Sequence, residues 1–142
     1  MQVVVDTSVL MAAAIRDSRV REVLLRPGID WAVPLEARSE CWEHVGEIAD
    51  AMGGSVEDAQ RVLRIVFDRV TLVEVPPHCP ERVTALEVIG ARDASDAAFV
   101  ALALRIGSPG IWSLDQDFDE IPGIVRLDTA AARRLAEAAP LR

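Results

Sequence analysis

Acidic side chains follow two apolar segments of this sequence at the points where those segments end. Valines 3–5 form a β-branched run that ends on Asp6, and the segment GIWSL (110–114) ends on Asp115. Short apolar runs of this kind are typical of strands buried on both faces of a sheet. Parallel strands bring their carboxyl ends to one edge, where α/β proteins place their ligands. Asp6 and Asp115 can therefore belong to one functional cluster.

Further acids stand close to these two positions in the predicted arrangement. Asp93 and Asp96 open the strongly apolar segment 91–107, and Asp117 and Asp119 follow the second strand. Closely packed carboxylates repel one another unless a cation compensates their charge. Oxygen ligands without cysteine or histidine favour hard ions such as Mg²⁺ or Mn²⁺. The acids together predict a site for a divalent metal.

Each acid also has a purely structural interpretation. Asp6 can be a turn residue or a cap for a helix over residues 9–15. Asp93 and Asp96 match the D-x-x-D form of a capping pair, and carboxylates near a helix N-terminus are stabilised by its dipole. The segment DQDFDE (115–120) can be a solvated turn. Taken one at a time, the acids do not distinguish these interpretations from metal binding.

The segment 35–52 has a helical period with its acids well away from the apolar stripe. Its glutamates fall within a narrow arc at about 100° per residue, namely Glu36, Glu40, Glu43 and Glu47. This arrangement is usual for a solvated helix face, so periodicity alone does not single out Glu40.

Strands alternate with helices along the chain. Short apolar runs predict strands at 3–5, 29–34, 71–76, 110–115 and 123–128. Helical spacing predicts helices at 9–15, 19–26, 35–52, 56–70 (capped by Ser55), 81–90, 91–107 and 129–139. This alternation predicts an α/β fold, a three-layer α/β/α sandwich around a mostly parallel sheet of about five strands. We expect residues 1–142 to form a single domain.

Composition excludes several classes of function. All 15 basic residues are arginine, which excludes a P-loop lysine or a Schiff-base lysine. The net charge of −8 argues against broad attraction to nucleic acid or an anionic membrane, although a local site can still take up cations. No apolar run is long enough to span a bilayer, and no signal peptide is expected. Cys41 and Cys79 lack metal-site spacing, so we expect reduced thiols in a cytoplasmic protein.

Four motifs occur in an informative order: VVVDTSVLMAA, PLEARSECWEHV, RDASDAAFVALAL and GIWSLDQDF. In order and approximate spacing the sequence resembles the PIN domain family, and in particular its toxin-type (VapC-like) members from bacterial and archaeal toxin–antitoxin pairs. The resemblance extends from Val3 to about Asp128. It implies a PIN-like α/β fold.

The resemblance also implies which residues form the site. By their places in the motifs, the metal-binding and catalytic acids are Asp6, Glu40, Asp96 and Asp115. Asp117 is implied as an additional metal ligand, and Asp93 resembles a supporting acid found in part of the family. Glu36 or Glu43 replaces Glu40 if the helix is in a different register.

Two positions depart from the common pattern of the family. Ser8 stands where many members carry asparagine, and Ser113 stands where many carry threonine. Both retain a side chain that can hydrogen-bond a carboxylate or the substrate, so they are expected to support the site.

The function implied by the resemblance is that of an endoribonuclease dependent on Mg²⁺ or Mn²⁺, the toxin of a toxin–antitoxin pair. Its implied partners are RNA, a cognate antitoxin that covers the acidic pocket with a basic element, and a second copy of the chain in a homodimer. Because the chain is acidic, RNA affinity must come from the metal and a few arginines, for which Arg38 and Arg92 are candidates.

Three alternatives remain at this stage. A PIN-like chain that has lost catalysis would serve in binding or regulation. A haloacid-dehalogenase-like phosphatase also begins with a strand-end aspartate, but Ser8 stands where its second acid belongs and no lysine is present. A receiver domain with Asp6 as phosphate acceptor lacks its usual acidic pair and its lysine.

Overall fold

The computed structural model describes residues 1–15, 18–89 and 93–140 of the chain. Within these residues one sheet has five strands in the order β3-β2-β1-β4-β5, and every neighbouring pair is parallel. The strands are β1 (Gln2–Val5), β2 (Asp30–Pro34), β3 (Thr71–Val73), β4 (Ile111–Trp112) and β5 (Arg126–Leu127). The predicted α/β fold with a parallel sheet is confirmed.

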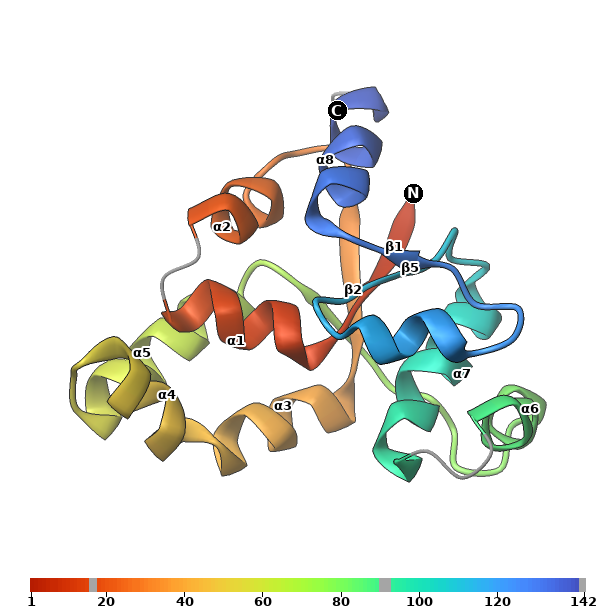
Figure 1. Cartoon of the computed structure of the whole chain (residues 1–142), viewed down its shortest axis with the longest axis horizontal. Coiled ribbons are helices and arrows are strands. Elements are labelled where there is room, and N and C mark those ends of the chain that lie inside the picture. Colours follow the sequence, from red (N-terminus) through yellow and green to blue (C-terminus); the bar gives the residue numbers. More distant parts are fainter. Residues whose placement is uncertain (16–17, 90–92, 141–142) are drawn as a thin grey trace.

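Helices cover both faces of the sheet, which gives the three predicted layers. Figure 1 shows α1, α4 and α5 on one side of the sheet and α6 and α7 on the other. The helices are α1 (Thr7–Ile15), α2 (Ser18–Leu24), α3 (Leu35–Glu43), α4 (Val45–Met52), α5 (Val56–Phe67), α6 (Pro80–Ile89), α7 (Ala97–Ile106) and α8 (Thr129–Ala138). Two short 3₁₀ helices are also present. The first, η1 (Ala94–Asp96), precedes α7, and the second, η2 (Gln116–Glu120), follows β4.

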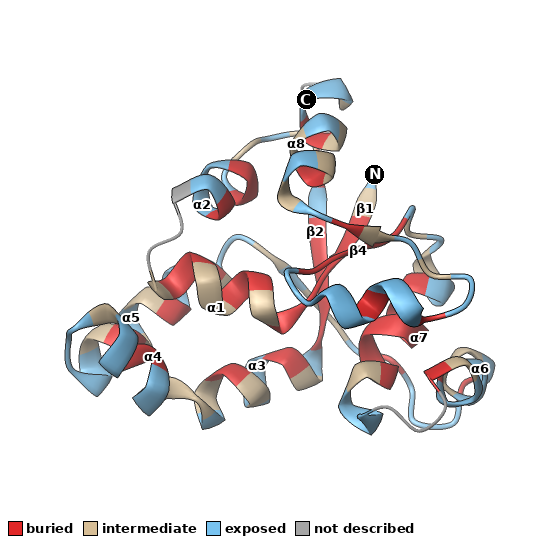
Figure 2. Cartoon of the chain, in the orientation of Figure 1, coloured by how far each residue is buried: buried red, intermediate tan, exposed pale blue. Residues whose placement is uncertain are grey.

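The core lies where the helices on both sides of the sheet pack against its central strands β2, β1 and β4 (Figure 2). Residues Val3, Val4 and Val5 of β1 are fully buried, as their β-branched run predicts. Helix α7 is buried over its whole first two turns, which explains its continuous apolar sequence. The rings of Trp31 in β2 and Trp112 in β4 pack with centroids 5.0 Å apart.

The entry to β4 is held closely against both neighbouring strands. Ser108 Oγ accepts a hydrogen bond from the amide of Val4 (3.1 Å) and donates one to the carbonyl of Gly110 (2.6 Å). A Cβ on Gly110 would lie 2.5 Å from the carbonyl oxygen of Val125, so only glycine allows β5 to approach so closely here. These contacts fix the position at which β4 begins.

Several element boundaries differ from those predicted. The predicted helix 35–52 is two helices, because the backbone at His44 (φ −99°, ψ 14°) leaves the helical region. The run His44-Val45-Gly46 contains three poor helix formers, which explains why the break falls there. The predicted strand 71–76 ends at Val73, three residues before the pair Pro76-Pro77.

The strands on the β4 side are also shorter than predicted. Strand 110–115 forms a ladder only at residues 111–112, because the following residues turn into η2. Strand 123–128 pairs only at residues 126–127. Helix 91–107 begins as η1 at Ala94 and becomes α-helical at Ala97, and its first two residues lie outside the described ranges.

Helix α5 begins with the cap predicted from the sequence. Ser55 accepts a hydrogen bond from the amide of Asp58, and the Asp58 side chain accepts one from the amide of Ser55. Cys41 and Cys79 are free and buried, as expected for unpaired thiols, and burial raises the pKa of Cys41 to about 12. No helix of the described ranges is long and apolar enough to cross a lipid bilayer.

Candidate active site

The two strand-end acids lie side by side because their strands are neighbours. Strands β1 and β4 pair at Val5 and Trp112, and the amide of Asp6 donates to the carbonyl of Trp112 (2.9 Å). Asp6 is 7% exposed, an unusual burial for a carboxylate, and both Asp6 and Asp115 line a pocket of about 470 Å³. The same pocket is lined by Glu40, Asp93 and Asp96.

Two hydroxyl groups hold one oxygen of Asp6. Oδ2 accepts hydrogen bonds from Ser8 Oγ (2.7 Å) and Ser113 Oγ (2.9 Å). Each hydroxyl in turn accepts a backbone amide, that of Leu114 at Ser8 and that of Asp115 at Ser113. Since a hydroxyl carries one proton, the protons of both hydroxyl groups are directed at the same oxygen of Asp6. Within the described ranges hydrogen bonds reach the carboxylate only at Oδ2, so Oδ1 is available to a ligand.

Glu40 joins the site from α3. Its Oε2 accepts a hydrogen bond of 2.6 Å from Thr7 Oγ1, the residue directly after Asp6. Burial raises the pKa of Glu40, the negative charges of Asp6 and Asp93 raise it further, and the Thr7 hydrogen bond acts in the opposite direction. The raised pKa of Glu40 thus reflects, in part, the carboxylates that lie close to it.

The two alternatives to Glu40 are placed differently. Glu36 pairs with Arg82 (2.8 Å) and lines a neighbouring pocket of about 370 Å³. Glu43 is exposed and reaches the acidic pocket at the end of α3. Glu40 is the glutamate of the three that accepts a hydrogen bond from Thr7, the first residue of α1, and its role as the site glutamate stays a prediction.

Asp93 and Asp96 enter the pocket from the start of α7, but their side chains have different local roles. Asp93 accepts a hydrogen bond from the amide of Ser95 (3.0 Å), and this bond lowers the pKa of Asp93. Asp93 is therefore a cap, as its structural interpretation predicts. Asp96 makes no capping hydrogen bond to α7, so the capping interpretation of Asp96 is wrong.

Asp115 and Asp117 complete the acidic edge. Asp115 Oδ1 accepts a hydrogen bond from the amide of Asp117 (2.9 Å), which forms the tight turn at the start of η2. Both side chains are exposed and, with Asp93 and Asp96, line a further pocket of about 330 Å³. All six acids assigned to the site from the sequence therefore lie at one edge of the sheet.

The donor set fits a hard divalent ion in chemistry, charge and location, since it consists of carboxylates gathered at one pocket. Among the described residues, no three histidine, cysteine, aspartate or glutamate side chains converge closely enough to hold one ion together. The acids stand around the pocket rather than around a single point. Metal binding by these residues therefore stays a prediction.

Sequence reasoning missed three polar residues around the site. Thr7 is buried against Glu40, and Arg82 holds Glu36 at the edge of the neighbouring pocket. Arg126 donates to the carbonyl of Ser113 (3.1 Å) and to Asp119 (3.0 Å), which ties β5 to the turn after β4. Of the three, only Thr7 could have been suspected from the local sequence, because it stands inside the motif that contains Asp6.

The two arginines suggested for RNA contact are not placed in the pocket by the structure. Arg38 is exposed on α3 and is not among the residues that line the acidic pocket. Arg92 lies outside the described residues.

Comparison with known proteins gives a family and a fold. The model of the PIN domain family matches residues 4–130. The crystal structure of VapBC2 from Rickettsia felis, bound to a DNA fragment from their promoter, aligns with a TM-score of 0.69 and 14% identity over 90% of this chain and 98% of that chain. PAE2754 from Pyrobaculum aerophilum aligns with a TM-score of 0.67 and 19% identity over 97% and 96%. No curated protein matches the sequence. At these identities the structural likeness is one of fold.

Proposed function

Because the chain belongs to the PIN domain family, we propose that it is a metal-dependent endoribonuclease and the toxin of a toxin–antitoxin pair. The observation that carries this proposal is the pocket at the carboxyl edge of the sheet, which is lined by five of the six assigned acids, from four separate segments of the chain. The placement of these acids supports phosphodiester hydrolysis over the haloacid-dehalogenase-like reaction, which needs a second acid where Ser8 stands and a lysine.

In the proposed mechanism, Asp6, Glu40, Asp96 and Asp115 would hold one or two Mg²⁺ or Mn²⁺ ions, with Asp117 as an additional ligand. A bound ion supplies an activated water and stabilises charge on the scissile phosphate. Asp6 offers Oδ1, because Ser8 and Ser113 hold its Oδ2. A carboxylate beside the attacking water can take its proton.

The experiment is a cleavage assay with protein first treated with EDTA. We expect single-stranded or structured RNA to be cleaved after Mg²⁺ or Mn²⁺ is added, and not in EDTA alone. DNA of the same sequence serves as the control for RNA as substrate. Cleavage that continues unchanged in EDTA contradicts the metal mechanism, and absence of cleavage with every metal favours the inactive, binding or regulatory alternative.

We further propose a cognate antitoxin as partner and a cytoplasmic location, where RNA and antitoxin are both present. The solved VapBC2 proteins bind a fragment of their own promoter, which supports such a pairing by analogy. The excess of carboxylates in the pocket favours a basic inhibitory element, with an arginine seated among Asp6, Glu40 and Asp115. Homodimer formation remains a prediction from the family resemblance.

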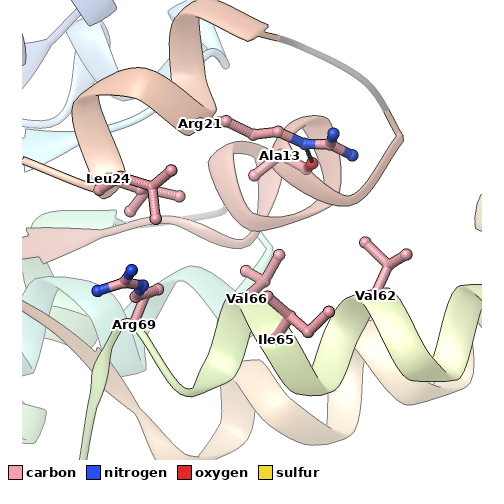
Figure 3. A pocket seen from close by; sticks show the side chains of 8 residues that line it. Ala13, Arg21, Leu24, Val62, Ile65, Val66 and Arg69 are labelled. Carbon is pink, nitrogen blue, oxygen red and sulfur yellow. Dashed lines mark hydrogen bonds between the residues drawn. The ribbon is translucent and has the colours of Figure 1, made fainter.

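A second surface suits the apolar part of such a partner. A groove of about 220 Å³ lies between α5 and helices α1 and α2, and Figure 3 shows Val62, Ile65 and Val66 of α5 facing it. Ile65 is 59% exposed and Leu25, at the end of α2, is 51% exposed. Contiguous exposed apolar side chains on a soluble domain indicate a binding surface.

The position and charge of the groove favour the same antitoxin as its occupant. Arg21 and Arg69 line it, so an apolar segment flanked by carboxylates would be complementary. Helix α1 contributes Ala13 to the groove, and Thr7 and Ser8 to the acidic pocket. Thr7 and Ala13 are six residues apart, which is about 9 Å along the helix axis. One elongated partner can therefore contact both surfaces.

Ile65→Glu is expected to weaken antitoxin binding by about 10-fold or more, because it places a charge on an apolar contact. RNase activity and folding should be retained, since Ile65 is exposed and is not among the residues that line the acidic pocket. Leu86→Glu, at a 53% exposed position of α6 on the other side of the sheet, is the matched control. Calorimetry with the purified antitoxin measures the binding affinity of both variants. Unchanged affinity contradicts the assignment, and a change from dimer to monomer instead assigns the groove to self-association.

A further inference from the structure

Thr7 forms a hydrogen bond with Glu40, one of the acids that line the pocket. Its side chain is 8% exposed, and its Oγ1 donates to Glu40 Oε2 at 2.6 Å. This length lies within the usual range of a hydroxyl–oxygen hydrogen bond. The bond joins the first residue of α1 to the middle of α3, two elements that are separate in the sequence.

Other acids of the site also accept hydrogen bonds at one carboxylate oxygen only. At Asp6, Ser8 and Ser113 hold Oδ2. At Asp115, the backbone amide of Asp117 holds Oδ1. In each case the hydrogen bonds within the described ranges reach one carboxylate oxygen and leave the second for a ligand. Thr7 does this for Glu40.

Glu40 needs such a partner more than the aspartates do. Its side chain has three rotatable bonds, so more of its conformations can turn the carboxylate away from Asp6. In the described ranges, the side-chain hydrogen bond that holds it toward Asp6 is the one from Thr7. Threonine is β-branched and therefore stiff, so its hydroxyl is a well-defined anchor.

We propose that Thr7 is a positioning residue that turns Glu40 into the acidic pocket and leaves its Oε1 free to bind a divalent cation. Thr7 and Ser8 thus direct consecutive hydroxyl groups at two different acids, Glu40 and Asp6. This inference rests on the proposed metal site and adds a residue that the family motifs do not assign to it.

The test compares Thr7→Val, which keeps the shape and removes the hydroxyl, with Thr7→Ser, which keeps the hydroxyl. Mn²⁺ binding to EDTA-treated protein is measured by calorimetry, and melting of the metal-free protein by circular dichroism. We expect Thr7→Val to weaken Mn²⁺ binding by about 10-fold or more, and Thr7→Ser to restore it. A role only in packing would not be restored selectively by serine.

The chain offers a closely matched control. Thr71 Oγ1 donates to Asp30 Oδ1 (2.5 Å), a threonine–carboxylate hydrogen bond at the exposed edge of the sheet. Thr71→Val should leave Mn²⁺ affinity unchanged. Wild-type affinity in Thr7→Val overturns the role of Thr7 alone, whereas a wild-type protein that binds no Mn²⁺ overturns the metal site and this inference with it.

Discussion

Asp96→Asn is expected to reduce RNA cleavage by more than about 100-fold. Groups that only support a metal ligand cost about 10–100-fold in affinity or activity when removed, so loss of a ligand's charge should cost more. Asparagine keeps the size of the side chain and removes its charge. Cleavage of a labelled RNA at saturating Mn²⁺ measures the effect, and calorimetry should show weaker Mn²⁺ binding.

The same substitution should leave the metal-free protein as stable as the wild type, or more so. Asp96 makes no capping hydrogen bond, so no cap is lost. Loss of its interaction with the helix dipole costs about 0.3–1 kcal/mol. Against this, the change removes one carboxylate from a pocket shared with Asp93 and Asp115 and so relieves repulsion. The melting temperature without metal should be unchanged or raised.

Asp50→Asn is the control for this variant. Asp50 is exposed on α4 and is not among the residues that line the acidic pocket, so activity, metal affinity and stability should all be retained. Asp58 would be a poor control, because its side chain closes the capping box of α5. Wild-type cleavage and normal Mn²⁺ affinity in Asp96→Asn would remove Asp96 from the metal site.

Trp112→Ala is expected to have the largest effect on stability, about 3–5 kcal/mol of the free energy of unfolding. Trp112 is fully buried in β4, packs against Trp31, and donates from Nε1 to Thr129 Oγ1 (3.3 Å). Truncation removes these contacts and leaves a cavity under the acidic edge. Since domains of this size are stable by about 5–15 kcal/mol, the loss should be readily measurable.

Urea unfolding followed by circular dichroism measures this loss. Leu86→Ala, at an exposed position of α6, is the control and should change the free energy of unfolding by less than about 0.5 kcal/mol. A loss below about 1 kcal/mol for Trp112→Ala would contradict the packing described for the centre of the sheet.

The sheet and its acidic edge could be predicted because short apolar runs in the sequence indicate the strands and the acids follow them directly. Valines 3–5 and the segment before Asp115 are apolar without alternation, and parallel strands necessarily bring Asp6 and Asp115 to one edge. The break at His44 was not predicted, because the apolar period continues through it while the backbone turns. Strand lengths at β4 and β5 depend on pairing between distant segments, which periodicity does not report.

The choice among the three glutamates of α3 also needed the fold. Helical spacing places Glu36, Glu40 and Glu43 on one arc. What separates them is tertiary contact, because Glu36 pairs with Arg82 and Glu40 accepts a hydrogen bond from Thr7, whereas Glu43 is exposed. The partners come from helices far along the chain, so no local pattern in α3 reveals them. Thr7 stands inside the motif around Asp6, but its contact with Glu40 was missed because that contact joins α1 to α3.

The most direct test of the metal site is calorimetric titration of EDTA-treated protein with Mn²⁺. The wild type should bind one or two ions, and Asp6→Asn should bind them far more weakly, because Asp6 is the most buried acid of the pocket and offers Oδ1 to the ion. No Mn²⁺ binding by the wild type, or equal binding by Asp6→Asn, would contradict the assignment of the acidic pocket as a metal centre.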